Sequence, residues 1–201
     1  MKLHEQIARY YPQYHTVEHY PSHLCAPIRS TKEEWGIFGN FYKANISVLG
    51  VSFDCTERLF HLMKFGAPEA SFEGIRSEYE QRCGMGIKMH MKKIHREHPD
   101  WLRPDWGQMV VDAMRFCLQT KFEQCEPFRQ ALERSKGLPI VEDETLRRKG
   151  RDADSWGCVL TGDEYVGPNL LGRLLMDLRD HGKLEYTLPD DAFAFIDALK
   201  D

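Results

Sequence analysis

The chain has 201 residues, and 27 Lys and Arg against 31 Asp and Glu give it a formal net charge of −4. With 42% hydrophobic and 11% aromatic residues, its composition is that of a globular protein and excludes a disordered or fibrous one. No apolar run approaches the ~18 residues of a membrane-spanning helix, and the polar start lacks the apolar centre of a signal peptide. We therefore expect a soluble, cytoplasmic protein of one domain, long enough to bury a core without disulfides.

The cysteines and histidines give no metal-binding pattern. The six cysteines are dispersed, form no CxxC pair and match no zinc spacing, which favours reduced and mostly buried thiols. His90, His95 and His98 lie close in sequence, but no carboxylate–histidine motif on one helical face accompanies them. We expect no metal site.

The elements before the middle of the chain are short. Residues 1–27 are expected to form an N-terminal extension, with a short amphipathic stretch interrupted by prolines. Residues 37–42 and 46–53 are β-branched and aromatic, and they predict two short strands separated by a turn. Asp54 is a candidate N-cap for a helix reaching about residue 65, and Glu57 three residues later resembles a capping box.

The remaining elements are mainly helical. The Gly167-Pro168-Asn169 turn places Asn169 as a candidate cap for one of these helices. Helices are not interleaved with strands at a repeating βαβ period, so we predict an α+β fold that is mainly helical with a few short strands. The expected helices cover 71–80, 87–94, 108–122, 128–134, 170–180 and a short tail from 190, and the expected strands lie at 138–142 and 156–160.

Three charged residues share one side of the helix after Asp54. At 100° per residue, Glu57, His61 and Lys64 fall within a narrow arc. A carboxylate, an imidazole and an amine on one stripe could transfer protons at a ribose or phosphate substrate. The same spacing is typical of any solvated helix face, and spacing alone favours that interpretation.

A second stretch, residues 82–103, is locally basic in an acidic protein. Such an excess attracts phosphates of a nucleotide or a nucleic-acid backbone. Lys88 follows Gly84-Met85-Gly86 in the first turn of the expected helix, where the helix dipole disfavours the ammonium form. A neutral amine there could attack an aldehyde-level sugar carbon, although a solvated lysine is the commoner case. The basic residues are Arg82, Lys88, Lys92, Lys93, Arg96 and Arg103, against Glu97 and Asp100.

Two tryptophans stand at expected loop ends beside acidic residues. Trp106 follows Asp105, and Trp156 follows Asp152 and Asp154. The indoles could stack on a base while the acids bind ribose hydroxyls or a developing positive charge. Packing of each tryptophan against the hydrophobic core is as good an interpretation as ligand binding.

An ordered series of motifs resembles the NADAR family, named for NAD and ADP-ribose. The series covers about residues 28–180, and its order carries the signal because no single motif is decisive. The motifs are RSTKE at 29–33, GIFGNFY at 36–42, ExxFxxxKF at 57–65, GIK at 86–88, RPDW at 103–106, KFEQ at 121–124, PIVE at 139–142, WG at 156–157 and VGPNLLGRLLM at 166–176.

The resemblance implies a NADAR-like domain over 28–201 that cleaves the bond between a ribose anomeric carbon and a nitrogen, without metal or cofactor. It also implies an active-site lysine that forms a Schiff base with the opened sugar. Lys88 is the first choice by position and Lys64 is the alternative. Glu57 is the expected acid/base or ribose-binding carboxylate, and Asp154, preferred to Asp152 by its spacing from Trp156, is the second acid. The expected substrate-binding residues are Arg29, Asn40, Phe41, His61, Lys64, Trp106, Trp156 and Asn169.

The leading expectation is an N-glycosidase that removes ADP-ribose from modified guanine in nucleic acid, because the basic stretch 82–103 suits a pyrophosphate or nucleic-acid substrate. One alternative has the same chemistry on a ribosylaminopyrimidine phosphate, an intermediate of riboflavin biosynthesis. A second alternative is a module that binds ADP-ribose or NAD without cleaving it. The expected partner is thus a nucleotide-type substrate, with or without nucleic acid, and no membrane.

Overall fold

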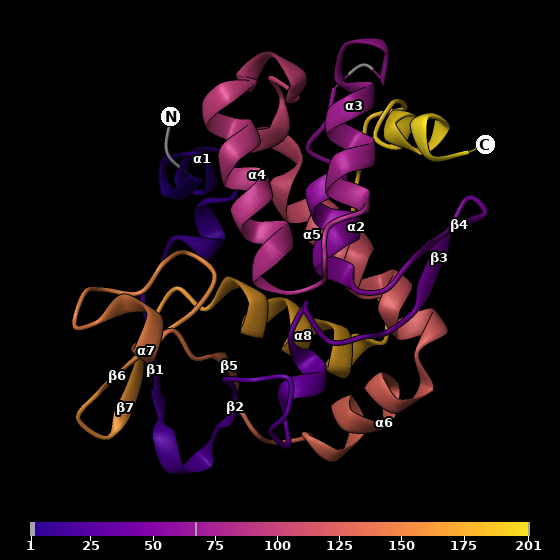
Figure 1. Cartoon of the computed structure of the whole chain (residues 1–201). Helices are drawn as coiled ribbons and strands as arrows, with labels where there is room; N and C mark the ends of the chain where they lie inside the picture. Colours follow the sequence, from indigo (N-terminus) through magenta and orange to yellow (C-terminus); the bar gives the residue numbers. More distant parts are fainter. Residues whose placement is uncertain (1–2, 67, 201) are drawn as a thin grey trace. The chain divides into compact units, whose positions relative to one another are not determined.

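The structure is a computed structural model that describes residues 3–66 and 68–200. Its elements form two compact units (Figure 1). Unit 1 contains residues 3–42 and 126–184, and unit 2 contains residues 43–125 and 185–200. Each unit is described by itself below. Helices predominate over short strands in both, which confirms the predicted α+β, mainly helical fold.

Unit 1 combines small sheets with three longer helices. Strand β7 lies between β1 and β6, antiparallel to both, and β2 pairs in parallel with β5. Helix α8 packs directly on β5, because a Cβ at Gly172 would lie 2.1 Å from the carbonyl oxygen of Ile140. The elements are α1 (Leu3–Tyr10), β1 (Glu18–Pro21), β2 (Ala26–Ile28), α6 (Glu126–Arg134), β5 (Ile140–Glu142), α7 (Thr145–Arg148), β6 (Val159–Thr161), β7 (Glu164–Gly167) and α8 (Leu170–His181).

Unit 2 is a helical group with one hairpin. Helix α2 contacts α3, α4 and the long helix α5, whose buried face is apolar from Met109 to Leu118 and polar at its C-terminal end, where Lys121 is buried. Within this unit, Figure 1 shows α5 passing beside α2. The elements are β3 (Ile46–Val48), β4 (Val51–Phe53), α2 (Thr56–Leu62), α3 (Pro68–Tyr79), α4 (Met85–Glu97), α5 (Trp106–Gln124) and the 3-10 helix η5 (Ala194–Leu199).

Two predicted strands are wrong. Residues 37–42 do not extend, since a 3-10 helix, η3 (Gly36–Phe38), and further i to i+3 hydrogen bonds turn the backbone through Tyr42. Residues 46–53 are a complete hairpin rather than one strand. Its turn residues, Leu49 at φ 50° and Gly50 at φ 86°, both occupy the left-handed region that a tight two-residue hairpin loop requires.

Neither predicted cap residue caps its helix through its side chain, because each side chain has a different partner. The Asp54 carboxylate accepts hydrogen bonds from Arg58, and Cys55 is the residue that precedes α2. Asn169 does precede α8, but its amide group bonds to the backbone of β5 instead of capping the helix.

The predicted helices from residue 71 onward are confirmed, with α3, α4, α5, α6, α8 and η5 in the expected places. The strands at 138–142 and 156–160 correspond to β5 and β6. Strands β1, β2 and β7 and the one-turn helix α7 were not predicted. The expected boundary at residue 28 falls within β2, and the preceding strand β1 pairs with β7.

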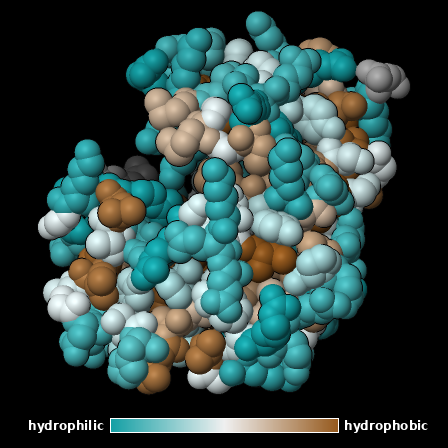
Figure 2. Space-filling model, turned by 60° about the horizontal axis from the view of Figure 1, so that its bottom comes forward, coloured by the Kyte–Doolittle hydropathy of each residue, from teal (hydrophilic) through white to brown (hydrophobic). Residues whose placement is uncertain are grey.

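In the described part of the chain, no helix combines the length and the apolar character needed to cross a membrane. Figure 2 shows one face of the molecule, on which hydrophilic side chains predominate and hydrophobic ones are scattered.

Candidate functional site

Helix α2 presents the stripe of charged side chains that its sequence predicts. Its opposite face is buried in unit 2 through Leu59, Leu62 and Met63, all with no exposed surface. That packing fixes the rotation of the helix, so Glu57 and His61 lie together. The helix ends at Leu62, earlier than predicted, and Lys64 follows in the next turn, close enough for its charge to act on Glu57. The stripe is not a solvated face, because the Glu57 side chain is 14% exposed and that of His61 6%.

A chain of ionisable side chains runs from α2 to α3 and α4. Oε1 of Glu57 lies 3.3 Å from Nε2 of His61, and Nδ1 of His61 lies 3.1 Å from Oε1 of Glu78. The other oxygen of Glu78 lies 2.6 Å from Nδ1 of His90. Each imidazole is thus held by a carboxylate whose side chain has no exposed surface, which fixes both ring orientations.

Glu57 is ionised in this environment. Burial alone would raise the pKa of its carboxyl, but the hydrogen bond and the charge of His61 and the ammonium groups of Lys64 and Lys88 outweigh it and lower the pKa below its ordinary value. A buried carboxylate that stays charged at neutral pH is suited to stabilise positive charge that develops on a bound substrate.

Lys64 lies two residues after the end of α2, and its amine is close to two aromatic rings. Its Nζ lies 5.1 Å from the centre of the Phe60 ring and 5.6 Å from that of Trp106, whose rings pack edge to face. Burial, with a smaller contribution from the charge of Lys88, lowers the pKa of Lys64 to about 8, although Glu57 and Glu78 oppose the change. About one tenth of this amine is therefore neutral and nucleophilic at pH 7, far more than of an ordinary lysine.

Lys88 is the fourth residue of α4 and is partly buried. Its positive charge lowers the pKa of both Glu57 and Lys64. The structure therefore brings both candidate lysines to the same carboxylate.

The basic stretch 82–103 is divided between surface and interior. Lys92, Lys93 and Arg96 are exposed on α4. Arg103 is buried, and its guanidinium bonds to Asp105 and Asp191. The cationic surface is thus made by α4, and Arg103 fixes the start of α5 to the C-terminal segment of unit 2.

Of the eleven residues expected in the site, the structure brings five together in unit 2: Glu57, His61, Lys64, Lys88 and Trp106. The other six lie in unit 1: Arg29, Asn40, Phe41, Asp154, Trp156 and Asn169.

Arg29 is held in a separate polar cluster of unit 1. Its Nε donates to Oδ2 of Asp143 at 2.9 Å, and its Nη2 donates to the hydroxyl of Tyr165 at 2.7 Å. The Tyr165 hydroxyl also donates to Asp143. The Arg29 side chain nevertheless remains 46% exposed, so an oriented guanidinium faces solvent.

The remaining unit 1 residues differ in burial. Asn40 is buried and Phe41 partly buried, beside the turn that η3 begins. Asp154 is exposed, and its carboxylate accepts a hydrogen bond from the backbone of Ser155 at 2.7 Å. Trp156, partly buried, precedes Gly157, where a Cβ would lie 2.4 Å from the carbonyl oxygen of Glu142.

Asn169 has no exposed surface, and its side-chain amide forms hydrogen bonds with the backbone of β5. Its Oδ1 accepts from the backbone N–H of Glu142 at 3.1 Å, and its Nδ2 donates to the carbonyl of Ile140 at 2.9 Å. These bonds account for Asn169 within the fold without a ligand.

Two residues of this chain of side chains are not among those predicted from the sequence: Glu78, the partner of His61, and His90, the second partner of Glu78. Glu78 follows the buried Ser71 and Ile75 at helical spacing, which is the signal that it faces inward on α3. A carboxylate on a buried helix face requires a partner, and no local pattern indicates which histidine supplies it.

Comparisons with known proteins identify a family and several relatives. A family profile described as NADAR domain matches residues 28–181. The "Riboflavin biosynthesis protein VVA0006" of Vibrio vulnificus (strain YJ016) is 28% identical over 188 residues, covering 88% of this chain and 46% of that protein. "N-glycosidase YbiA" of Escherichia coli (strain K12) is 29% identical over 169 residues, covering 84% of this chain and 95% of that protein.

A solved structure is also similar. The NMR structure of the E. coli protein YbiA matches with a TM-score of 0.57 and 29% identity, over 83% of this chain and 90% of that one. The chain thus spans just under half the length of the Vibrio protein and nearly all of the E. coli protein.

Proposed function

The chain belongs to the NADAR family, and we propose that it is an N-glycosidase whose reaction takes place at the Glu57–His61–Lys64 stripe of helix α2. The observation that carries the proposal is a buried, ionised carboxylate beside an amine whose pKa is lowered to about 8. The relative named N-glycosidase YbiA supports the reaction class.

The proposed reaction replaces a sugar–nitrogen bond by a sugar–oxygen bond. The neutral lysine amine forms a C–N bond to the anomeric carbon, and the bond to the base nitrogen breaks. The base leaves with its electron pair and takes up a proton. Glu57 stabilises the positive charge that develops on the sugar. The product is a glycosylamine, whose first amine proton goes to the base. Its ring opens as the bond between the anomeric carbon and the ring oxygen breaks, and that oxygen takes up the second proton of the nitrogen to leave an imine. Water then adds to the imine and releases the amine and the free sugar, so one water is consumed in each cycle.

The amine is Lys64 or Lys88, and its environment favours Lys64. Lys64 lies in the turn that follows the helix of Glu57, and its amine is close to the Phe60 and Trp106 rings, where its ammonium form is desolvated. Borohydride reduction during turnover should trap the sugar on one lysine, and peptide mapping identifies it. Lys64→Met and Lys88→Met are the matched variants. Trapping on Lys88 assigns that residue instead, and turnover without any lysine adduct contradicts the covalent step.

As substrate we propose guanine that carries ADP-ribose in nucleic acid. Helix α4 carries Lys88 in its first turn and exposes Lys92, Lys93 and Arg96 further along. Several cations on one helix suit a pyrophosphate or a nucleic-acid backbone better than one phosphate. The proposed partner is therefore a nucleotide-type substrate within nucleic acid.

A second candidate substrate is a ribosylaminopyrimidine phosphate, favoured by the similarity to a protein named for riboflavin biosynthesis. Incubation of the protein with each substrate separates the two, using an ADP-ribosylated guanine oligonucleotide and the pyrimidine intermediate in parallel. Release of base from the pyrimidine alone contradicts the ADP-ribosyl proposal. Tight binding of ADP-ribose, with no base released by wild type or Glu57→Gln, indicates a binding module and contradicts the enzyme.

A further inference from the structure

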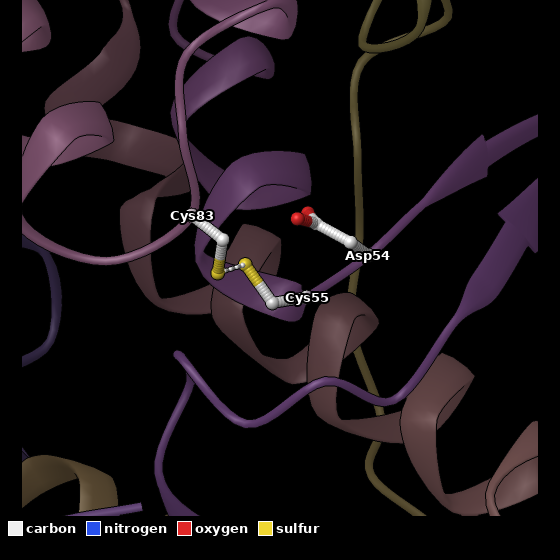
Figure 3. A group of neighbouring side chains, drawn as sticks. All are labelled: Asp54, Cys55 and Cys83. Carbon is white, nitrogen blue, oxygen red and sulfur yellow. Dashed lines mark hydrogen bonds between the residues drawn. The ribbon is translucent and has the colours of Figure 1, made fainter.

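Two cysteines from distant parts of unit 2 meet at the start of α2. Their Sγ atoms lie 2.9 Å apart, with Asp54 beside them (Figure 3). Cys55 is fully buried immediately before α2, and Cys83 is partly exposed in the loop between α3 and α4. Three other thiols have different partners. Cys25 and Cys158 donate to backbone carbonyl oxygens, and Cys117 donates to a thioether sulfur.

Arg58 holds the two segments that carry these thiols. From the first turn of α2, its guanidinium donates to both oxygens of Asp54, at 2.7 and 3.1 Å. It also donates to the backbone carbonyls of Glu78 at 3.1 Å, of Tyr79, and of Gln81 at 2.6 Å. The loop that carries Cys83 is therefore already fastened to α2 when both thiols are reduced, so closing a bond between them requires little movement.

We propose that Cys55 and Cys83 form a reversible disulfide when a low-molecular-weight disulfide, such as glutathione disulfide, is present. The Cys83 thiolate attacks one sulfur of the oxidant and releases one glutathione thiol. Cys55 then gives up its proton, attacks the Cys83 sulfur of the mixed disulfide and releases the second glutathione. Two protein thiols are oxidised to one disulfide, and one glutathione disulfide is reduced to two thiols.

The fully buried amine of Lys121 supports the second step. Burial lowers the pKa of this lysine to about 7, and its charge interacts with Cys125 and Cys55. Burial raises the pKa of the Cys55 thiol, so Cys55 needs a nearby base before it can attack. A neutral amine in the same interior can accept that proton.

The same group of atoms is less suited to a metal ion. Asp54, Cys55 and Cys83 offer three ligand atoms within 4.8 Å of one another. Both oxygens of Asp54 are already bound by Arg58, whose positive charge beside the thiols opposes a second cation.

The disulfide would join the helix that carries Glu57 to the loop before the helix that carries Lys88. It also closes a chain segment of 28 residues, which restricts the unfolded state and stabilises unit 2. Oxidised protein should therefore unfold at a temperature higher by about 5 °C, and a reductant should reverse the change.

The test treats the full-length protein with glutathione disulfide and measures thiols, intact mass and peptides. We expect loss of two of the six thiols, a mass lower by about 2 Da and one linked peptide pair containing Cys55 and Cys83. Cys83→Ser should lose this link and the thermal shift. Cys25→Ser, which removes another partly exposed cysteine, should keep both. These readouts do not depend on glycosidase activity.

Retention of six thiols after treatment overturns the proposal, as does linkage of other cysteine pairs to the same extent. Zinc that stays with reduced wild type after dialysis, and is lost in Cys83→Ser, also overturns it and indicates a metal site.

Discussion

His61 and Glu78 lie 17 residues apart in the sequence, and Nδ1 of His61 lies 3.1 Å from Oε1 of Glu78. The contact connects the stripe on α2 to a carboxylate of α3 that has no exposed side-chain surface. Nε2 of the same ring lies 3.3 Å from Glu57, so the imidazole of His61 contacts both Glu57 and Glu78. Its orientation is therefore fixed before any substrate binds.

Replacement of Glu57 by glutamine should reduce kcat by about 10²- to 10⁴-fold. The amide keeps the shape of the side chain but removes the charge that opposes a developing positive sugar. Single-turnover release of base measures the effect, with folding checked by circular dichroism. Glu80→Gln, which changes an exposed glutamate on the chain just after α3, should retain wild-type activity. Equal losses in both variants would remove Glu57 from the chemistry.

Activity should rise with pH if Lys64 acts as the free amine. The pKa of Lys64 is lowered to about 8, so its neutral fraction increases about tenfold per pH unit below that value and levels off above it. The pH dependence of kcat/KM measures this midpoint. In Lys88→Met the midpoint should move to higher pH, because Lys88 helps to lower the pKa of Lys64. A midpoint that does not move in this variant contradicts the electrostatic coupling.

Stability should also depend on pH through Lys121, which is fully buried in α5. Its pKa is lowered from 10.5 to about 7, so the unfolded chain binds more protons above pH 7, and stability must rise as the pH increases. Between pH 7 and pH 9 this group should add about 2 kcal/mol to the free energy of unfolding. Denaturant unfolding measures it, and Lys121→Met should remove that increment. The same slope in both proteins would show that Lys121 stays charged.

Two glycine substitutions should have opposite effects on stability. In Gly172→Ala the new Cβ would lie 2.1 Å from the Ile140 carbonyl oxygen, so α8 must move away from β5 at a cost of about 2 kcal/mol or more. In Gly86→Ala the nearest atom is 3.9 Å away, on Arg82, and α4 should gain up to about 1 kcal/mol from helix propensity. Thermal unfolding compares them. An unchanged midpoint for Gly172→Ala would contradict the packing of α8 on β5.

The sequence by itself determined the helices and the stripe on α2. Apolar residues at helical spacing identified α5, and the arc of Glu57, His61 and Lys64 followed from the 3.6-residue period, because both are properties of neighbouring residues. The ordered family motifs likewise needed no coordinates. Residues 37–42 differ from the predicted strand, because their aromatic side chains have strand propensity while hydrogen bonds to nearby carbonyls turn the chain.

The tertiary structure decided which of these residues work together. The burial that lowers the pKa of Lys64, the approach of Lys88 to Glu57, and the Glu78 link between two histidines each require helices separated in the chain to pack against one another. Desolvation and charge interactions depend on distance in space rather than on spacing in sequence. For that reason the candidate residues could be named from the sequence, whereas their ionisation and the meeting of Cys55 with Cys83 could not.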